Sequence, residues 1–127
     1  MFLCFDIGGS SVKVVLLKKG KIVKKRYEKL PAKFSQMVEL IVTLKREMLE
    51  PRTSVKGIGF SLAGALSPAR DKMLLSFNIP YLNNKPLLKI FQKKLACKNI
   101  RIEHDINCFL LAEMKTGVAK KYRIYFI

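Results

Sequence analysis

Two short stretches of the sequence carry residues that could handle a phosphate. The first, FDIGGSSVK, places the carboxylate of Asp6 before two glycines and two serines. Glycines permit positive φ and close approach of a ligand, while hydroxyls and successive N–H groups can hold an anion. A carboxylate repels a phosphate unless a cation lies between them, so Asp6 suggests Mg²⁺ held through water. The predicted phosphate and Mg²⁺ residues are Asp6, Gly8, Gly9, Ser10 and Ser11.

An ordinary hairpin turn with a solvated Asp6 explains the same stretch equally well. The residues that follow, VVLL, are those of a strand. Phosphate loops of the Rossmann and Walker kinds lead into a helix instead. The loop is therefore expected between two strands, and taken alone its two interpretations are evenly matched.

The second stretch, IRIEHDINCFLLAE, predicts a strand that ends where a helix begins, at Asp105. The helix dipole favours a negative charge at that position. An ionised Asp there can orient a hydroxyl and accept its proton late in phosphoryl transfer. A simple N-cap is the commoner reason for such an Asp, and the residues alone favour it. Asn107 and Glu113, on the same helix, are interpreted as structural.

The elements that must position these residues follow from hydrophobic periodicity. Three strands joined by short turns come first, and helices then alternate with strands around one long loop. This order predicts an α/β fold with a mixed sheet and helices on its faces. The expected strands are 2–7, 12–17, 21–30, 55–62, 100–104 and 122–127, the expected helices 34–49, 86–95 and 105–117, and the loop 63–85.

Composition places limits on the partners of this domain-sized chain of 127 residues. Its 25 Lys and Arg against 9 Asp and Glu give a net charge of +16. The basic residues are scattered and lack interleaved aromatic residues, so we expect neither a specific nucleic acid nor a membrane as partner. Cys4, Cys97 and Cys108 lack metal-ligand spacing and fit reduced thiols in the cytoplasm.

Four segments together resemble the ROK family of bacterial sugar kinases, in the same order and similar spacing: FDIGGSSVK, GIGFSLAGALSP, SFNIP and IEHDINCFLLAE. The family has an Asp-Ile-Gly-Gly-Thr loop, a Gly-Ile-Gly strand leading to Pro-Gly-Pro, a Ser-Pro-Asn-Leu loop and a Glu-Asn-Asp-Ala-Asn helix start. The chain looks most like its glucokinase and N-acetylmannosamine-kinase-like members. The resemblance implies the actin-like, ribonuclease-H-like ATPase fold, which agrees with the predicted order of elements.

The resemblance also implies an activity, the phosphorylation of a hexose or N-acetylhexosamine hydroxyl by ATP with Mg²⁺. Asp105 matches the catalytic base of the family, and Asn78 matches a sugar-contacting Asn. By this correspondence the sugar-binding residues are Gly64, Asn78, His104 and Asp105.

The chain departs from the family pattern at three places around this site. His104 replaces the Asn before the catalytic Asp, which leaves the identity of the sugar open. Ala63 and Ala65 replace the two prolines around Gly64, so that loop is expected to be less rigid. Phe77 replaces the Pro before the sugar-contacting Asn.

The resemblance covers one half of a two-domain protein. Residues 1–117 are predicted to form the N-terminal, sugar-side domain, and 118–127 a linker and first strand leading into a second domain absent from this chain. We expect the chain alone to be inactive, and its final strand to favour a homodimer or other association. A non-catalytic carbohydrate-binding domain and a ROK-type repressor are the alternatives. The early first strand leaves no room for a DNA-reading domain and argues against the repressor.

Overall fold

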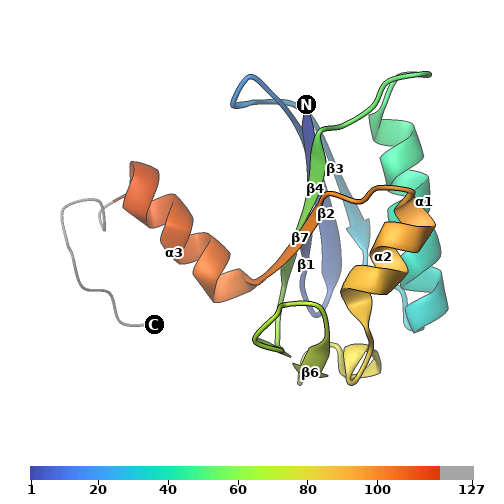
Figure 1. The fold of residues 1–127 in the computed structure, drawn as a ribbon, viewed down its shortest axis with the longest axis vertical. Helices are drawn as coiled ribbons and strands as arrows, with labels where there is room; N and C mark the ends of the chain where they lie inside the picture. The colour runs from blue at the N-terminus through green and yellow to red at the C-terminus, as the bar shows by residue number, and fades with distance from the viewer. Residues whose placement is uncertain (118–127) are drawn as a thin grey trace.

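The computed structural model describes residues 1–117, and a five-stranded mixed sheet runs through its centre (Figure 1). The first three strands pair antiparallel, and two later strands add in parallel on the other side of β1, giving the order β3-β2-β1-β4-β7. This confirms the predicted mixed sheet. The strands are β1 (Phe2–Ile7), β2 (Ser11–Lys18), β3 (Lys21–Lys29), β4 (Gly57–Leu62) and β7 (Ile100–His104).

Two helices, α1 (Phe34–Met48) and α2 (Leu87–Leu95), cover one face of this sheet (Figure 1). Each presents an apolar stripe at helical spacing, as the periodicity predicts. Phe60 of β4 stacks between Phe5 of β1 and Phe91 of α2, with ring centroids 5.0 and 4.3 Å apart. The buried helix residues are Met37, Val38, Ile41, Leu44, Met48, Leu87, Phe91 and Leu95.

The other face of the sheet is less covered than the sequence suggests. The near-continuous apolar run of β4 predicts a strand buried on both sides. In the structure Gly59 and Ser61 are only half-buried. The third helix, α3 (Asp105–Thr116), leaves the sheet beyond β7 and has no buried residue (Figure 1). Within residues 1–117, α1 and α2 therefore cover one face, while α3 contacts β4 and β7 without burying a residue, so the expected burial of β4 on both faces is not met.

The predicted long loop 63–85 contains structure of its own. A small antiparallel hairpin, β5 (Ala65–Leu66) and β6 (Met73–Leu75), is followed by a 3₁₀ turn, η1 (Pro80–Leu82). Strands of two and three residues are too short to show a periodicity in the sequence. The buried Ser76 hydroxyl donates to the Ala63 carbonyl at 2.6 Å and accepts from the Ile79 N–H at 3.1 Å. Hydrogen bonds thus hold the segment in which the family has prolines.

The densest run of basic residues follows the β2–β3 turn and the exposed edge strand β3. Lysines along an edge strand oppose pairing with another chain, so this run has a structural explanation. The described residues contain no helix long and apolar enough to cross a membrane. The predicted strand 122–127, the domain boundary at 117/118 and the expected association lie outside the described residues.

If this basic edge binds DNA, we expect binding without sequence preference. Affinity should fall by about 10³-fold or more between roughly 50 and 200 mM salt, because phosphate contacts release counterions. Fluorescence anisotropy with two unrelated duplexes measures both properties. A complex that prefers one sequence and survives physiological salt would contradict this expectation.

Candidate functional site

The segments singled out in the sequence meet at one edge of the sheet. Strands β1, β4 and β7 run parallel, so their carboxyl ends lie side by side. The GGSS turn follows β1, Gly64 follows β4, and His104 and Asp105 close β7 and open α3. In open α/β sheets this edge is where ligands bind.

A hollow of about 360 Å³, here called the edge hollow, opens at this place. One wall comes from the β4–β5 turn, β6 and the following loop, and the other from the β7–α3 junction. The structure brings the four predicted sugar-binding residues together here. The lining residues are Ala63, Gly64, Ala65, Leu75, Phe77, Asn78, His104, Asp105 and Ile106.

The GGSS segment is a tight turn between two strands, as predicted, but its glycines serve another purpose than expected. Gly20 and Gly64 are the described glycines with positive φ, so neither Gly8 nor Gly9 uses that freedom. The Gly8 N–H donates to the Ser11 carbonyl at 3.0 Å and is therefore not free for an anion. Ser11 itself is buried. Gly9 and Ser10 remain as the exposed part of the predicted phosphate loop.

Gly9 is required for the close approach of the turn to Asn78. A Cβ on Gly9 would lie 3.2 Å from the Asn78 Cβ and 3.4 Å from the Asn78 carbonyl oxygen. Contact with the turn therefore fixes the loop that carries Asn78. The candidate phosphate loop thus packs against a residue that lines the edge hollow.

We expect Gly9→Ala to displace the Asn78 loop by a few tenths of an ångström. Its free energy of unfolding should fall by about 1 kcal/mol relative to Gly8→Ala. Gly8→Ala is the matched control, because a Cβ there would meet nothing within 4 Å. Urea denaturation and the amide chemical shift of Asn78 report the two effects. Equal stability and equal Asn78 shifts in the two variants would contradict the contact.

Helix α3 begins at Asp105, as predicted, but His104 rather than Asp105 is its N-cap. The His104 Nδ1 accepts from the Ile106 N–H at 3.2 Å. The Asp105 Oδ1 lies 2.8 Å from the same N–H and 3.2 Å from His104 Nδ1. The plain N-cap interpretation of Asp105 is therefore wrong, while its carboxylate stays partly exposed beside the hollow.

Asp6 does not line the edge hollow. It lies on the uncovered sheet face, in a second hollow of about 460 Å³, opposite Lys13 of β2 and Ser61 of β4. The Cys108 thiol lines the same hollow, and burial raises its pKa. A hydrogen bond with Ser61 lowers this pKa, whereas the negative charges of Glu103, Asp6 and Asp105 raise it further. These carboxylates therefore converge around the first turn of α3.

A magnesium ion bound by a full set of side chains has no place among residues 1–117. They hold no group of three or more His, Cys, Asp or Glu that could bind a metal ion. Mg²⁺ commonly keeps several waters and takes one or two carboxylates together with substrate phosphates. The single exposed carboxylate of Asp6 fits that second mode.

Glu103 is a site residue that sequence reasoning missed. Its Oε1 accepts from Asn107 Nδ2 at 3.0 Å and from the His104 N–H at 2.9 Å, and its Oε2 accepts from Arg70 Nε at 2.6 Å. Burial would raise the pKa of Glu103, but these hydrogen bonds and the Arg70 charge together lower it below its usual value. The stability it contributes is therefore lost as pH falls through that lowered pKa. Asn107, interpreted as structural, belongs to this network.

Solved structures place the fold among sugar kinases. The ROK glucokinase of Streptomyces griseus, solved with glucose and AMPPNP, superposes with a TM-score of 0.82 over 95% of this chain and 38% of its own, at 20% identity. Lmo2764 of Listeria monocytogenes, a candidate N-acetylmannosamine kinase, superposes with a TM-score of 0.80 over 94% of this chain and 40% of its own, at 25% identity. The fold is thus the predicted actin-like one.

Curated relatives point the same way at the level of sequence. The N-acetyl-D-glucosamine kinase of Vibrio parahaemolyticus is 29% identical over 117 residues, which are 89% of this chain and 37% of the relative. The chain therefore spans little more than a third of such a relative and corresponds to its N-terminal part. The sequence pattern of the family matches residues 2–127, and the chain belongs to the ROK family.

Proposed function

We propose that this chain is the N-terminal, sugar-binding part of a kinase that phosphorylates a hydroxyl of a hexose or N-acetylhexosamine with ATP and Mg²⁺. One observation carries the proposal, the convergence of Gly64, Asn78, His104 and Asp105 around the edge hollow. These residues come from three segments up to 41 positions apart in the sequence. Their union at the carboxyl edge of the sheet gives the hollow both hydrogen-bonding groups and a carboxylate.

Each group has a role that its position allows. Asp105 orients the attacking hydroxyl and accepts its proton late in the transfer. The His104 imidazole and the Asn78 amide hold neighbouring hydroxyls, and the backbone of Gly64 lines the hollow beside them. Mg²⁺ would neutralise charge on the phosphates of ATP. Asp6 would hold the Mg²⁺, and the exposed Gly9 and Ser10 would contact the phosphates. We place the protein in the cytoplasm, where ATP is available.

The 127 residues by themselves are expected to bind sugar without phosphorylating it. Phosphoryl transfer depends on holding phosphate, metal and hydroxyl in line, and residues 1–117 supply one side of that arrangement. This makes a non-catalytic carbohydrate-binding domain the second candidate. The ROK transcriptional regulator related to Escherichia coli MLC shares the fold at 15% identity and a TM-score of 0.75, so the fold alone does not separate the classes.

Titration with a panel of hexoses and N-acetylhexosamines, followed by amide chemical shifts, tests the proposal. We expect saturable shifts at the four lining residues at millimolar sugar, and none along the remote strand β3. A panel that moves none of the four would contradict the proposed site. An ADP-release assay on the same chain should show no sugar-dependent turnover. Turnover abolished by Asp105→Asn would show that this part of the fold suffices for catalysis.

A further inference from the structure

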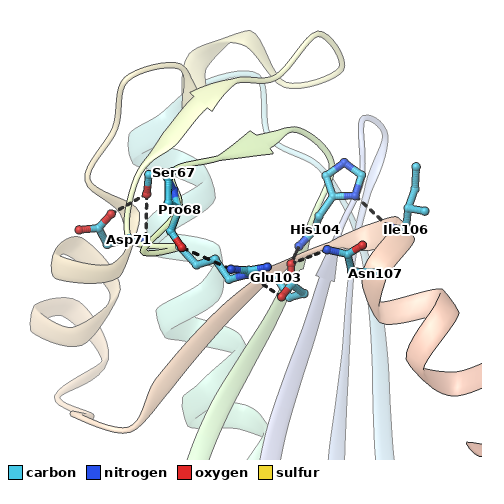
Figure 2. A network of polar contacts seen from close by, with 8 residues as sticks. Ser67, Pro68, Asp71, Glu103, His104, Ile106 and Asn107 are labelled. Carbon is cyan, nitrogen blue, oxygen red and sulfur yellow. Dashed lines mark hydrogen bonds and ion pairs between the residues drawn. The ribbon is translucent and has the colours of Figure 1, made fainter. Parts of the chain in front are cut away.

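A polar network links the β5–β6 hairpin to the start of α3 (Figure 2). Arg70, in the hairpin turn, donates from Nε to Glu103 Oε2 at 2.6 Å and from Nη1 to the Pro68 carbonyl at 3.3 Å. The other carboxylate oxygen of Glu103 holds Asn107 and the His104 N–H. The Glu103 carboxylate thus accepts hydrogen bonds from a hairpin turn, the end of β7 and the first turn of α3.

These elements are the two walls of the edge hollow. The hairpin and its flanking turns carry Gly64, Leu75 and Asn78, and the β7–α3 junction carries His104 and Asp105. Arg70 and Glu103 lie 33 positions apart, and their ion pair connects the two walls directly. The spacing between the walls decides which hydroxyls of a sugar can reach both of them.

The hairpin turn that carries Arg70 is held together by hydrogen bonds of its own. Ser67 Oγ lies 2.6 Å from Asp71 Oδ1 and accepts from the N–H groups of Asp71 and Lys72, both at 3.2 Å. The Arg70 N–H donates to the Ser67 carbonyl at 2.8 Å, closing a tight turn. Arg70 has a φ of 55°, a left-handed conformation that is uncommon for a non-glycine residue and fits a tight turn.

We propose that the Arg70–Glu103 pair is a clamp that sets the separation of the two walls and thereby the affinity of the edge hollow for sugar. Both are positioning residues, which act through His104 and Asp105 on one wall and the hairpin on the other. The inference rests on the proposed function. It adds the hairpin turn, which the sequence marks only as a loop, to the determinants of sugar recognition.

Two variants break the Arg70–Glu103 ion pair, and a third serves as their control. Glu103→Gln keeps an oxygen for Asn107 and the His104 N–H but puts an amide nitrogen where Arg70 needs an acceptor. Arg70→Met removes the other partner. The control is Arg26→Met on β3, which removes an arginine of similar exposure (44% against 49%) and its ion pairs with Glu28 and Glu47. The control changes net charge as Arg70→Met does, far from the hollow.

We expect each clamp variant to raise the dissociation constant for the sugar that the unaltered chain binds by about five-fold, and Arg26→Met to leave it unchanged. A double variant that combines Glu103→Gln with Arg70→Met should lose no more sugar affinity than either single variant, because the two residues form one contact. His104 is the one histidine of the 127 residues, so its ring resonances are unambiguous. They should shift in both clamp variants without sugar, and not in the control.

The outcomes separate the two proposals. Unchanged sugar affinity in both clamp variants of a chain that binds would overturn the clamp and leave the proposed function standing. Additive losses in the double variant would overturn the pairing of Arg70 with Glu103. Absence of sugar binding by the unaltered chain would overturn the proposed function and the clamp together. Amide spectra establish that each variant is folded before its affinity is compared.

Discussion

Asp105→Asn should lower the turnover of a complete enzyme by about 10²–10⁴-fold, with a smaller change in sugar affinity. The complete enzyme can be built by joining this chain to the complementary part of the Vibrio parahaemolyticus relative, of which it matches 37%. The effect is large because an amide cannot accept the proton of the attacking hydroxyl. A coupled assay for ADP release measures turnover at saturating sugar.

The structure makes this substitution a clean one. Asp105 Oδ1 accepts from the Ile106 N–H at 2.8 Å, and an Asn side chain keeps that acceptor. His104 caps the helix independently, so the stability of α3 should change little. Glu39→Gln is the control, since it removes one negative charge from the exposed side of α1, away from the site. Turnover unchanged by Asp105→Asn would reduce Asp105 to a residue of the first helical turn.

Periodicity predicted the elements whose side chains repeat over several turns or strand residues. The apolar positions 34, 37, 38, 41, 44 and 48 defined α1, and five of these side chains are buried as expected. The predicted mixed sheet followed from short turns between the first three strands and from later strands alternating with helices. The gathering of Asn78, His104 and Asp105 at one hollow was expected only from the resemblance to the ROK family, and the structure brings the three residues together.

Features decided by a few long-range contacts were not predictable in this way. The β5–β6 hairpin has strands of two and three residues, which carry no periodic signal. Glu103 forms an ion pair with Arg70, and no pattern in the sequence between these two residues indicates that they pair. His104 caps α3 although histidine is not a preferred N-cap residue, because its ring lies beside the Ile106 N–H.

Glycines illustrate the same limit at single residues. The sequence marks Gly8 and Gly9 as places for positive φ, yet the conformation at both is ordinary and only Gly9 is close to a neighbour. Gly64 was predicted from the family pattern as a sugar-binding residue. Its backbone shows a second, independent requirement for glycine, because it combines an unusual φ with very little free space.

Gly64→Ala should therefore lower the free energy of unfolding by about 3 kcal/mol, the sum of backbone strain and overpacking. Gly64 has a φ of 149°, a conformation that L side chains rarely adopt. A Cβ there would lie 2.6 Å from Met73 Sδ, 2.8 Å from the Leu75 carbonyl oxygen and 3.0 Å from Ser76 Cβ. Met73 and Ser76 are buried, so neither can move aside without disturbing the hairpin. Urea denaturation measures the loss.

Gly20→Ala separates the two causes of this loss. Gly20 also has a positive φ, 76°, but a Cβ there would meet nothing within 4 Å. Its variant should lose only the conformational part, about 1 kcal/mol. The difference between the variants then measures the crowding at Gly64, and equal losses would contradict it. Because Gly64 lines the edge hollow, its variant should also weaken sugar binding, whereas Gly20→Ala, in the remote β2–β3 turn, should leave it unchanged.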